Sequence, residues 1–143
     1  MRTITVALGE KTYNIEIAAG LLDQIGAKAR VLSQAVKAAI ISDSNVDPLY
    51  GERLERSLAA SGFEVTRIVF AAGEQSKNLT VLGQVYDELA RAGLTRSDLI
   101  LTLGGGVPGD LGGFAAATFL RGIDFIQVPT SLLAQIDSSV GGK

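Results

Sequence analysis

The chain has 143 residues, 47% of them hydrophobic and 20% charged, with a formal net charge of −2; these values are typical of one ordinary folded domain and exclude a disordered segment. Its Lys and Arg residues are scattered and no apolar run is long enough for a signal peptide or a membrane span, so we expect a cytoplasmic protein that binds neither nucleic acid nor membrane. Cysteine and histidine are absent, which excludes disulfides, thiolate metal sites and the commonest zinc ligand and general base.

A hairpin followed by alternating helices and strands is predicted in chain order. Residues 4–8 and 13–17 alternate between apolar and polar side chains around Gly9-Glu10-Lys11, the pattern of a β-hairpin. Beyond them, helical spacing predicts helices over 21–32, 48–60, 78–92 and 109–120, and apolar runs predict strands over 38–41, 65–70, 99–103 and 125–128. Because these strands are almost entirely apolar and alternate with helices, we expect an α/β fold: a parallel sheet with helices on both faces, preceded by the N-terminal hairpin.

The helix over 78–92 and the end of the chain carry further signals. One stripe of that helix holds Leu79, Leu82, Val85, Tyr86 and Leu89, and Gly93 stands where a helix usually ends. Near the end of the chain, residues 130–136 could form a last helix that Gly141-Gly142 would close. Lys143 follows, and nothing after it covers that surface, so a truncated chain and a natural split are both open.

A glycine-rich turn lies between the strand over 99–103 and the helix over 109–120. Its sequence, Gly104-Gly105-Gly106-Val107-Pro108-Gly109-Asp110, satisfies the G-x-G-x-x-G pattern of Rossmann-like dinucleotide-binding domains. Glycines let the backbone approach a pyrophosphate, a helix N-terminus attracts it, and Pro108 suits a first helical turn. A purely structural tight turn is the alternative. The motif normally follows the first strand, and Asp124 begins the next strand instead of ending it, so Asp43 is the better candidate for binding ribose.

Small, polar or ionisable residues follow four of the predicted strands, at the sheet edge where such folds bind ligands. They are Asp43 and Asn45; Gly73, Glu74 and Lys77; Gly104, Gly105 and Gly106; and Thr130 and Ser131. Together they favour a nucleotide cleft, although loops are polar in general and several of these residues could be helix caps. Asp110 would complement the helix dipole or contact ribose or nicotinamide. Arg121 would close a helix or bind a phosphate group, and Lys143 would bind substrate or be only a terminal charge.

Four segments of the chain resemble the 3-dehydroquinate synthases closely. They are 104–110, 114–122, 129–135 and 137–143, and the shorter pieces 43–46 and 73–77 fall where that family has its own. Two positions depart from the family pattern: Pro108 stands where an aliphatic residue is usual, and Ser131 replaces a usual Thr. Pro108 removes one backbone donor beside the glycine turn.

The resemblance implies a lyase of the shikimate pathway, on the route to chorismate and the aromatic amino acids. Such an enzyme converts 3-deoxy-arabino-heptulosonate 7-phosphate to 3-dehydroquinate and phosphate, with NAD as a catalytic cofactor that is returned unchanged. Zinc (or cobalt) acts as a Lewis acid, held by a glutamate and two histidines of a helical C-terminal domain. Because this chain has no histidine, we expect residues 1–143 to be a single NAD-binding domain without metal ligands, inactive alone. The family resemblance implies a homodimer acting on a sugar phosphate.

The resemblance also implies roles for individual residues. It places Asp43, Asn45, Glu74 and Lys77 at the adenosine and ribose end of NAD, and Gly105, Gly106 and Val107 at its pyrophosphate. On the nicotinamide side it places Asp110, Thr130, Ser131, Leu133 and Ser138. It implies that Asp137 and Lys143 reach the substrate, and that Arg121 binds the phosphonate-like end of the substrate across a dimer interface.

Two other hypotheses stay open. A related sugar-phosphate cyclase would use a different substrate, and the residues beyond Lys143 would distinguish it. A non-catalytic NAD-binding module, or one half of a split enzyme, would end at Lys143. Phosphate release from a mixture of the chain with substrate, NAD and zinc would separate an enzyme from such a module.

Overall fold

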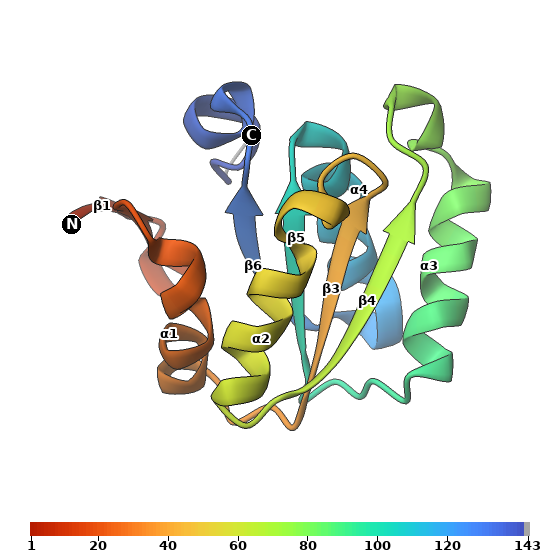
Figure 1. The fold of residues 1–143 in the computed structure, drawn as a ribbon, viewed down its shortest axis with the longest axis horizontal. Coiled ribbons are helices and arrows are strands. Elements are labelled where there is room, and N and C mark those ends of the chain that lie inside the picture. Colours follow the sequence, from red (N-terminus) through yellow and green to blue (C-terminus); the bar gives the residue numbers. More distant parts are fainter. Residues whose placement is uncertain (142–143) are drawn as a thin grey trace.

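A parallel sheet between two pairs of helices forms the body of the protein. The structure, a computed structural model, describes residues 1–141 (Figure 1). The strands are β1 (Arg2–Val6), β2 (Tyr13–Ile17), β3 (Lys37–Asp43), β4 (Glu64–Phe70), β5 (Leu99–Gly104) and β6 (Asp124–Pro129). The α-helices are α1 (Ile25–Leu32), α2 (Glu52–Ala60), α3 (Leu79–Arg91) and α4 (Gly106–Thr118). The predicted order of elements is confirmed.

The sheet has the strand order β4-β3-β5-β6, and each neighbouring pair is parallel. Ile41 pairs with Thr102 and Gly104 pairs with Pro129, so the carboxyl ends of β3, β5 and β6 meet at one edge. Helices α1 and α2 cover one face of the sheet, and α3 and α4 cover the other (Figure 1). The predicted α/β fold with helices on both faces is therefore correct.

Alternate residues of the central strands point to opposite faces of the sheet and pack into the two halves of the core. In β3, Ala38 and Ile40 pack with Leu54 and Leu58 on the side of α1 and α2. Ala39 and Ile41 point to the other side, against the helices α3 and α4. Leu54, Leu58 and Ile40 are completely buried, and each such side chain stabilises the fold by about 2 kcal/mol. This two-sided burial explains why β3 and β5 are almost purely apolar in sequence.

Several predicted helix boundaries need correction. The helix expected over 21–32 is a 3₁₀ turn, η2 (Leu21–Gln24), followed by α1, and the helix expected over 48–60 opens with a π-helical turn, η3 (Asp47–Gly51), before α2. In α3 the Asn78 side chain accepts the Val81 N–H and caps the helix, and Gly93 has a positive φ of 73°, as its position predicted. Leu79, which belongs to the predicted apolar stripe of this helix, is 82% exposed.

The glycine-rich helix and the last helix also differ from prediction. Helix α4 begins at Gly106 rather than Gly109 and ends at Thr118 rather than Leu120. It ends early because Phe119 is extended, with a ψ of 125°, and Leu120 and Arg121 follow with positive φ angles of 51° and 67° that a right-handed helix cannot accommodate. The last helix, predicted over residues 130–136, is confirmed from Leu132 onward, and its larger part is a π-helical turn, η6 (Ala134–Ser138).

The N-terminal hairpin lies beside the sheet rather than within it. Strands β1 and β2 pair antiparallel, as predicted, but Ile4 and Ile17 are 41% and 52% exposed. A salt bridge of 2.8 Å joins Glu16 of the hairpin to Lys28 of α1. The alternating pattern of these strands therefore predicted their pairing correctly, although little of their apolar surface is buried in residues 1–141.

A buried carboxylate fixes the turn that leads into β5. Asp98 is 5% exposed; one of its oxygens accepts the Lys37 N–H at 2.9 Å, and the other accepts the Thr95 N–H and hydroxyl at 2.8 and 3.0 Å. Burial alone would raise the pKa of Asp98, but these hydrogen bonds outweigh it and hold the pKa below its usual value. The carboxylate thus ties the start of β3 to the start of β5.

We expect Asp98→Asn to lower the free energy of unfolding by about 2 kcal/mol at pH 7, because an amide cannot accept all three hydrogen bonds. A lowered folded-state pKa adds stability above the unfolded pKa of about 4, and this stability is lost as pH falls through the folded pKa. The stability difference should therefore shrink below about pH 4. Urea unfolding from pH 2 to pH 7 measures it, with the exposed Asp87→Asn on α3 as control. An unchanged difference across that range would contradict the assignment.

No helix within residues 1–141 is both long and apolar enough to cross a membrane.

Candidate functional site

The glycine turn lies between β5 and α4, at the edge where the parallel strands end (Figure 1). Gly104 has a φ of 150°, and a Cβ atom there would lie 2.6 Å from Cγ of Pro108, so glycine is required. Gly105 is the N-cap of α4, and Pro108 falls in its first turn, as predicted. The G-x-G-x-x-G pattern therefore has the strand-turn-helix context that dinucleotide binding needs.

The beginning of α4 offers backbone donors to an anion. The N–H groups of a first helical turn have no acceptor within the helix, and Pro108 has no N–H at all. Gly106 and Val107 therefore present the donors of this turn, and the helix dipole adds a partial positive charge. A Cβ atom at Gly105 would lie 3.4 Å from the Ser131 hydroxyl oxygen, so the absence of side chains leaves the backbone open there.

A hydroxyl faces the turn without a partner. Ser138 Oγ is buried and has no hydrogen-bond partner among the described residues. It lies 3.4 Å from the place that a Cβ atom on Gly106 would occupy. A buried hydroxyl without a partner is costly, and a phosphate oxygen would supply the missing bond. The turn and this hydroxyl together fit a pyrophosphate.

Asp43 ends β3 at the level of the glycine turn, two residues beyond the pairing of Ile41 with Thr102. It is 8% exposed, and its Oδ1 accepts the N–H groups of Asn45 and Val46, both at 2.9 Å. This carboxylate thus shapes the loop after β3, and Asn45 is exposed on that loop. Asp43 therefore has the structural loop role that was one of the two alternatives in the sequence analysis.

The loop after β4 contacts helix α4 through an ion pair. Lys77 Nζ lies 2.7 Å from Asp110 Oδ2, and Glu74 is exposed at the start of the same 3₁₀ turn, η4 (Glu74–Ser76). The hydrogen bond to Asp110 is the main reason that the pKa of Lys77 is raised. The pair borders a hollow of about 430 Å³ that Leu79 and Phe114 also line.

The expected position of Asp110 needs correction. Because α4 starts at Gly106, Asp110 lies in the second turn of the helix, so its carboxylate is not among the residues that complement the helix dipole most strongly. Lys77 and Asp110, assigned to opposite ends of the cofactor, are in direct contact here. Their contact connects the loop after β4 to the helix after β5, a proximity that was not predicted from the sequence.

Residues after β6 form the remaining wall. The Thr130 N–H donates to the Gly104 carbonyl at 2.9 Å, and Ser131 Oγ accepts the Ala134 N–H at 3.2 Å. Leu133 is 65% exposed and precedes η6, which contains Asp137. Thr130, Ser131 and Ser138 thus surround the glycine turn, whereas the Leu133 side chain is open to solvent.

Arg121, which was assigned to the substrate, lies apart from this group. Arg121 is in the 3₁₀ turn η5 (Phe119–Arg121) before β6, at the opposite end of the sheet from the glycine turn (Figure 1). A role at the turn would therefore require Arg121 of a second copy, as the sequence-based hypothesis supposed. Lys143 lies outside the described residues.

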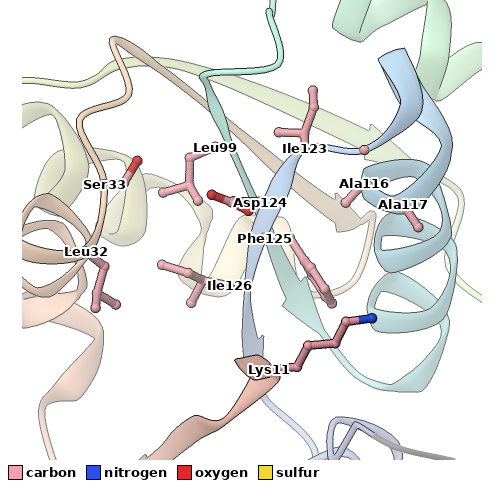
Figure 2. Close-up of a pocket in the computed structure, with 11 residues that line it drawn as sticks. Lys11, Leu32, Ser33, Leu99, Ala116, Ala117, Ile123, Asp124, Phe125 and Ile126 are labelled. Carbon is pink, nitrogen blue, oxygen red and sulfur yellow. The ribbon is translucent and has the colours of Figure 1, made fainter. Parts of the chain in front are cut away.

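A second hollow lies away from the glycine turn. A groove of about 600 Å³ follows the outer side of β6, where Leu32 and Ile126 lie on one side of the strand and Phe125 on the other (Figure 2). Lys11 lies at its rim (Figure 2). The groove is lined mainly by apolar side chains and contains none of the residues assigned to the nucleotide.

Two residues of the site were missed in the sequence. Gln127 Nε2 donates to the Ser139 carbonyl at 3.0 Å, and its Oε1 lies 3.3 Å from the place of a Cβ on Gly109. Tyr13 Oη accepts the Gly141 N–H at 2.7 Å. A polar residue within an apolar strand could have indicated Gln127, but nothing in the hairpin pattern distinguished Tyr13.

Acidic side chains do not gather into a metal site in the part of the chain described: no three of them come close enough together to hold an ion. The residues here therefore do not fit a zinc site, and the expectation that the metal ligands lie elsewhere stays a prediction.

Two solved structures are similar to this chain in fold. The chain is similar to a 2-deoxy-scyllo-inosose synthase complexed with carbaglucose-6-phosphate, NAD⁺ and Co²⁺ (TM-score 0.87, 26% identity, 96% of this chain and 38% of the other). It is also similar to the 2-epi-5-epi-valiolone synthase of Streptomyces hygroscopicus with bound NAD⁺ and Zn²⁺ (TM-score 0.75, 32% identity, 95% and 37%).

Sequence comparison identifies the family. The 3-dehydroquinate synthase of Clostridium acetobutylicum is 53% identical over 143 residues, which are 100% of this chain and 40% of that protein. The chain thus spans about two-fifths of the length of this relative. Residues 67–143 match the family described as 3-dehydroquinate synthase N-terminal. The chain therefore belongs to the 3-dehydroquinate synthase family.

Proposed function

We propose that this chain is the NAD-binding part of a 3-dehydroquinate synthase, which converts 3-deoxy-arabino-heptulosonate 7-phosphate to 3-dehydroquinate and phosphate. The observation that carries the proposal is the glycine turn at the start of α4, which the unpartnered Ser138 hydroxyl faces. An anion of the size of a pyrophosphate satisfies both the backbone donors and this hydroxyl. Similarity to two synthases with bound NAD⁺ supports the identity of that anion.

In this proposal, the loops after the four strands of the sheet bind different parts of NAD. Asp43, Asn45 and Glu74 lie on the loops after β3 and β4 and bind the adenosine and its ribose. Gly105, Gly106 and Val107 hold the pyrophosphate. The loop after β6, with Thr130, Ser131, Leu133 and Ser138, lines the nicotinamide side, and its Ser138 hydroxyl, beside Gly106, also binds the pyrophosphate. When bound, NAD supplies a temporary hydride acceptor for a substrate hydroxyl.

The contact between Lys77 and Asp110 adds a constraint on cofactor binding. The Lys77 ammonium donates to the Asp110 carboxylate at 2.7 Å, and this hydrogen bond raises the pKa of Lys77. A cofactor hydroxyl can then accept from Lys77 and donate to Asp110 at the same time. This explains how an acid so near a pyrophosphate turn can be useful: it meets ribose rather than phosphate.

Substrate binding involves Asp137 of η6 and Lys143, and Arg121 of a second copy in a homodimer. The metal that polarises the substrate hydroxyl would be held by residues outside this chain. The protein would act in the cytoplasm as part of the shikimate pathway. Isolated residues 1–143 would bind NAD without turning over the sugar phosphate.

Calorimetric titration of the chain with NAD tests the cofactor site, and phosphate release in the presence of substrate, NAD and zinc tests the reaction. Heat of binding without phosphate release is the expected result for the isolated chain. Absence of binding would contradict the NAD site. Turnover by the chain alone would overturn the expected inactivity and rule out a non-catalytic module.

A further inference from the structure

We propose that Tyr13 of the N-terminal hairpin is a positioning residue, which holds the segment 137–141 against the glycine turn. The inference rests on the proposed NAD site, and it assigns the hairpin a part in cofactor binding. Tyr13 lies 128 residues from its partner in sequence, so only the fold brings the two together.

The contact of Tyr13 with Gly141 is close and directional. The Tyr13 hydroxyl oxygen accepts the Gly141 N–H at 2.7 Å, which is a short distance for such a bond. A Cβ atom on Gly141 would lie 3.4 Å from that oxygen and 3.7 Å from the ring edge. The ring therefore packs against the Gly141 backbone as well as accepting its hydrogen bond.

A second anchor acts on the same segment from the sheet. Gln127 of β6 donates to the Ser139 carbonyl at 3.0 Å. The segment is also closed by its own turn, in which the Val140 N–H donates to the Asp137 carbonyl at 3.0 Å. Ser138 directly precedes the anchored part, so the two anchors fix where its hydroxyl meets Gly106.

The packing of the hairpin does not by itself explain the contact between Tyr13 and Gly141. Apolar side chains of both its strands, such as Ile4 and Ile17, are largely exposed, whereas Tyr13 is half-buried. The hydrogen bond of Tyr13 lies near the surface, where water can replace it at little cost to stability. Its main effect is therefore on the placement of the segment, and through Ser138 on the pyrophosphate.

Tyr13→Phe tests the proposal, because it removes the hydroxyl and keeps the ring. The control is Thr5→Val, which removes a hydroxyl that donates to Asn14 at 2.9 Å in the same hairpin and does not involve the segment. Three quantities are measured for each chain: NAD affinity by calorimetry, the exchange rate of the Gly141 amide by NMR, and the melting temperature.

We expect Tyr13→Phe to weaken NAD binding about fivefold, which corresponds to about 1 kcal/mol, and to speed exchange of the Gly141 amide. Its melting temperature should match that of the Thr5→Val chain, whose NAD affinity should equal that of the parent. Equal NAD affinity of the Tyr13→Phe and parent chains would overturn the positioning role while leaving the NAD site in place. Equal weakening by Thr5→Val would also overturn it, because the hairpin would then act only through general stability. If the parent chain itself fails to bind NAD, the proposed function falls and the positioning role with it.

Discussion

Replacing Gly26 by alanine is expected to lower the free energy of unfolding by about 3 kcal/mol, the upper end of the cost of overpacking. A Cβ atom at Gly26 of α1 would lie 1.9 Å from the carbonyl oxygen of Ser57 in α2 and 2.4 Å from its carbon. These are backbone atoms, so no rotation of a side chain can relieve the overlap. The two helices would have to move apart.

Other contacts between α1 and α2 resist that movement. The Gly26 N–H donates to Ser57 Oγ at 2.9 Å, and Arg30 Nε donates to the Ser61 carbonyl at 3.1 Å. Separation of the helices would strain both hydrogen bonds and would uncover Ala29, Leu54 and Leu58, which are completely buried. The substitution therefore disturbs one whole face of the core.

Thermal and urea unfolding measure the effect of Gly26→Ala. The matched control is Gly83→Ala in α3, where a Cβ atom would meet nothing within 4 Å. Alanine is the better helix former, so the control should gain up to about 1 kcal/mol. If both substitutions stabilise the protein, the close approach of α1 and α2 does not exist in solution.

Gly106→Val is expected to weaken NAD binding by about a hundredfold or more, corresponding to about 3 kcal/mol. Gly106 does not have the positive φ that only glycine adopts easily, so the backbone can keep its conformation. The branched side chain would instead occupy the space between the first turn of α4 and the Ser138 hydroxyl, 3.4 Å away. It would block the approach of a pyrophosphate to the N–H groups of the turn.

Calorimetric titration with NAD provides the measurement. Gly113→Ala in the same helix is the control, because its Cβ atom would make an ordinary 3.5 Å contact with the Phe125 ring and lies away from the turn. Circular dichroism establishes that both chains are folded. Full NAD affinity in a folded Gly106→Val chain would remove the glycine turn from the cofactor site.

The sheet and its helices could be predicted from the sequence because strands that are buried on both faces consist of continuous runs of apolar residues. Ala38, Ala39, Ile40 and Ile41 face opposite halves of the core in turn, and each position is therefore apolar. The glycine turn could be predicted for a similar reason, since a positive φ at Gly104 and contact with Pro108 restrict the residues allowed there.

Features that depend on distant parts of the chain could not be predicted in this way. Leu79 continues the apolar stripe of α3 but is the first residue of the helix, where little of the described chain covers it. Helix α4 ends early at the extended Phe119, and Leu120 and Arg121 after it have positive φ angles, although neither residue favours that conformation. The pairs Lys77–Asp110 and Tyr13–Gly141 join segments whose proximity follows only from the three-dimensional arrangement.

The strand order also shapes how the chain can fold. Strand β3 is central, yet its partner β5 lies far along the chain: the bonds from Lys37 to Asp98 and from Ser42 to Leu103 each close a loop of 61 residues. Closing so long a loop costs entropy before any contact is gained, so β3 and β4 should pair first and β5 should dock later. Pulsed amide-exchange labelling during refolding would reveal this order.

Until β5 docks, one edge of β3 can pair with other chains, so rapid closure of the sheet protects the folding chain from aggregation.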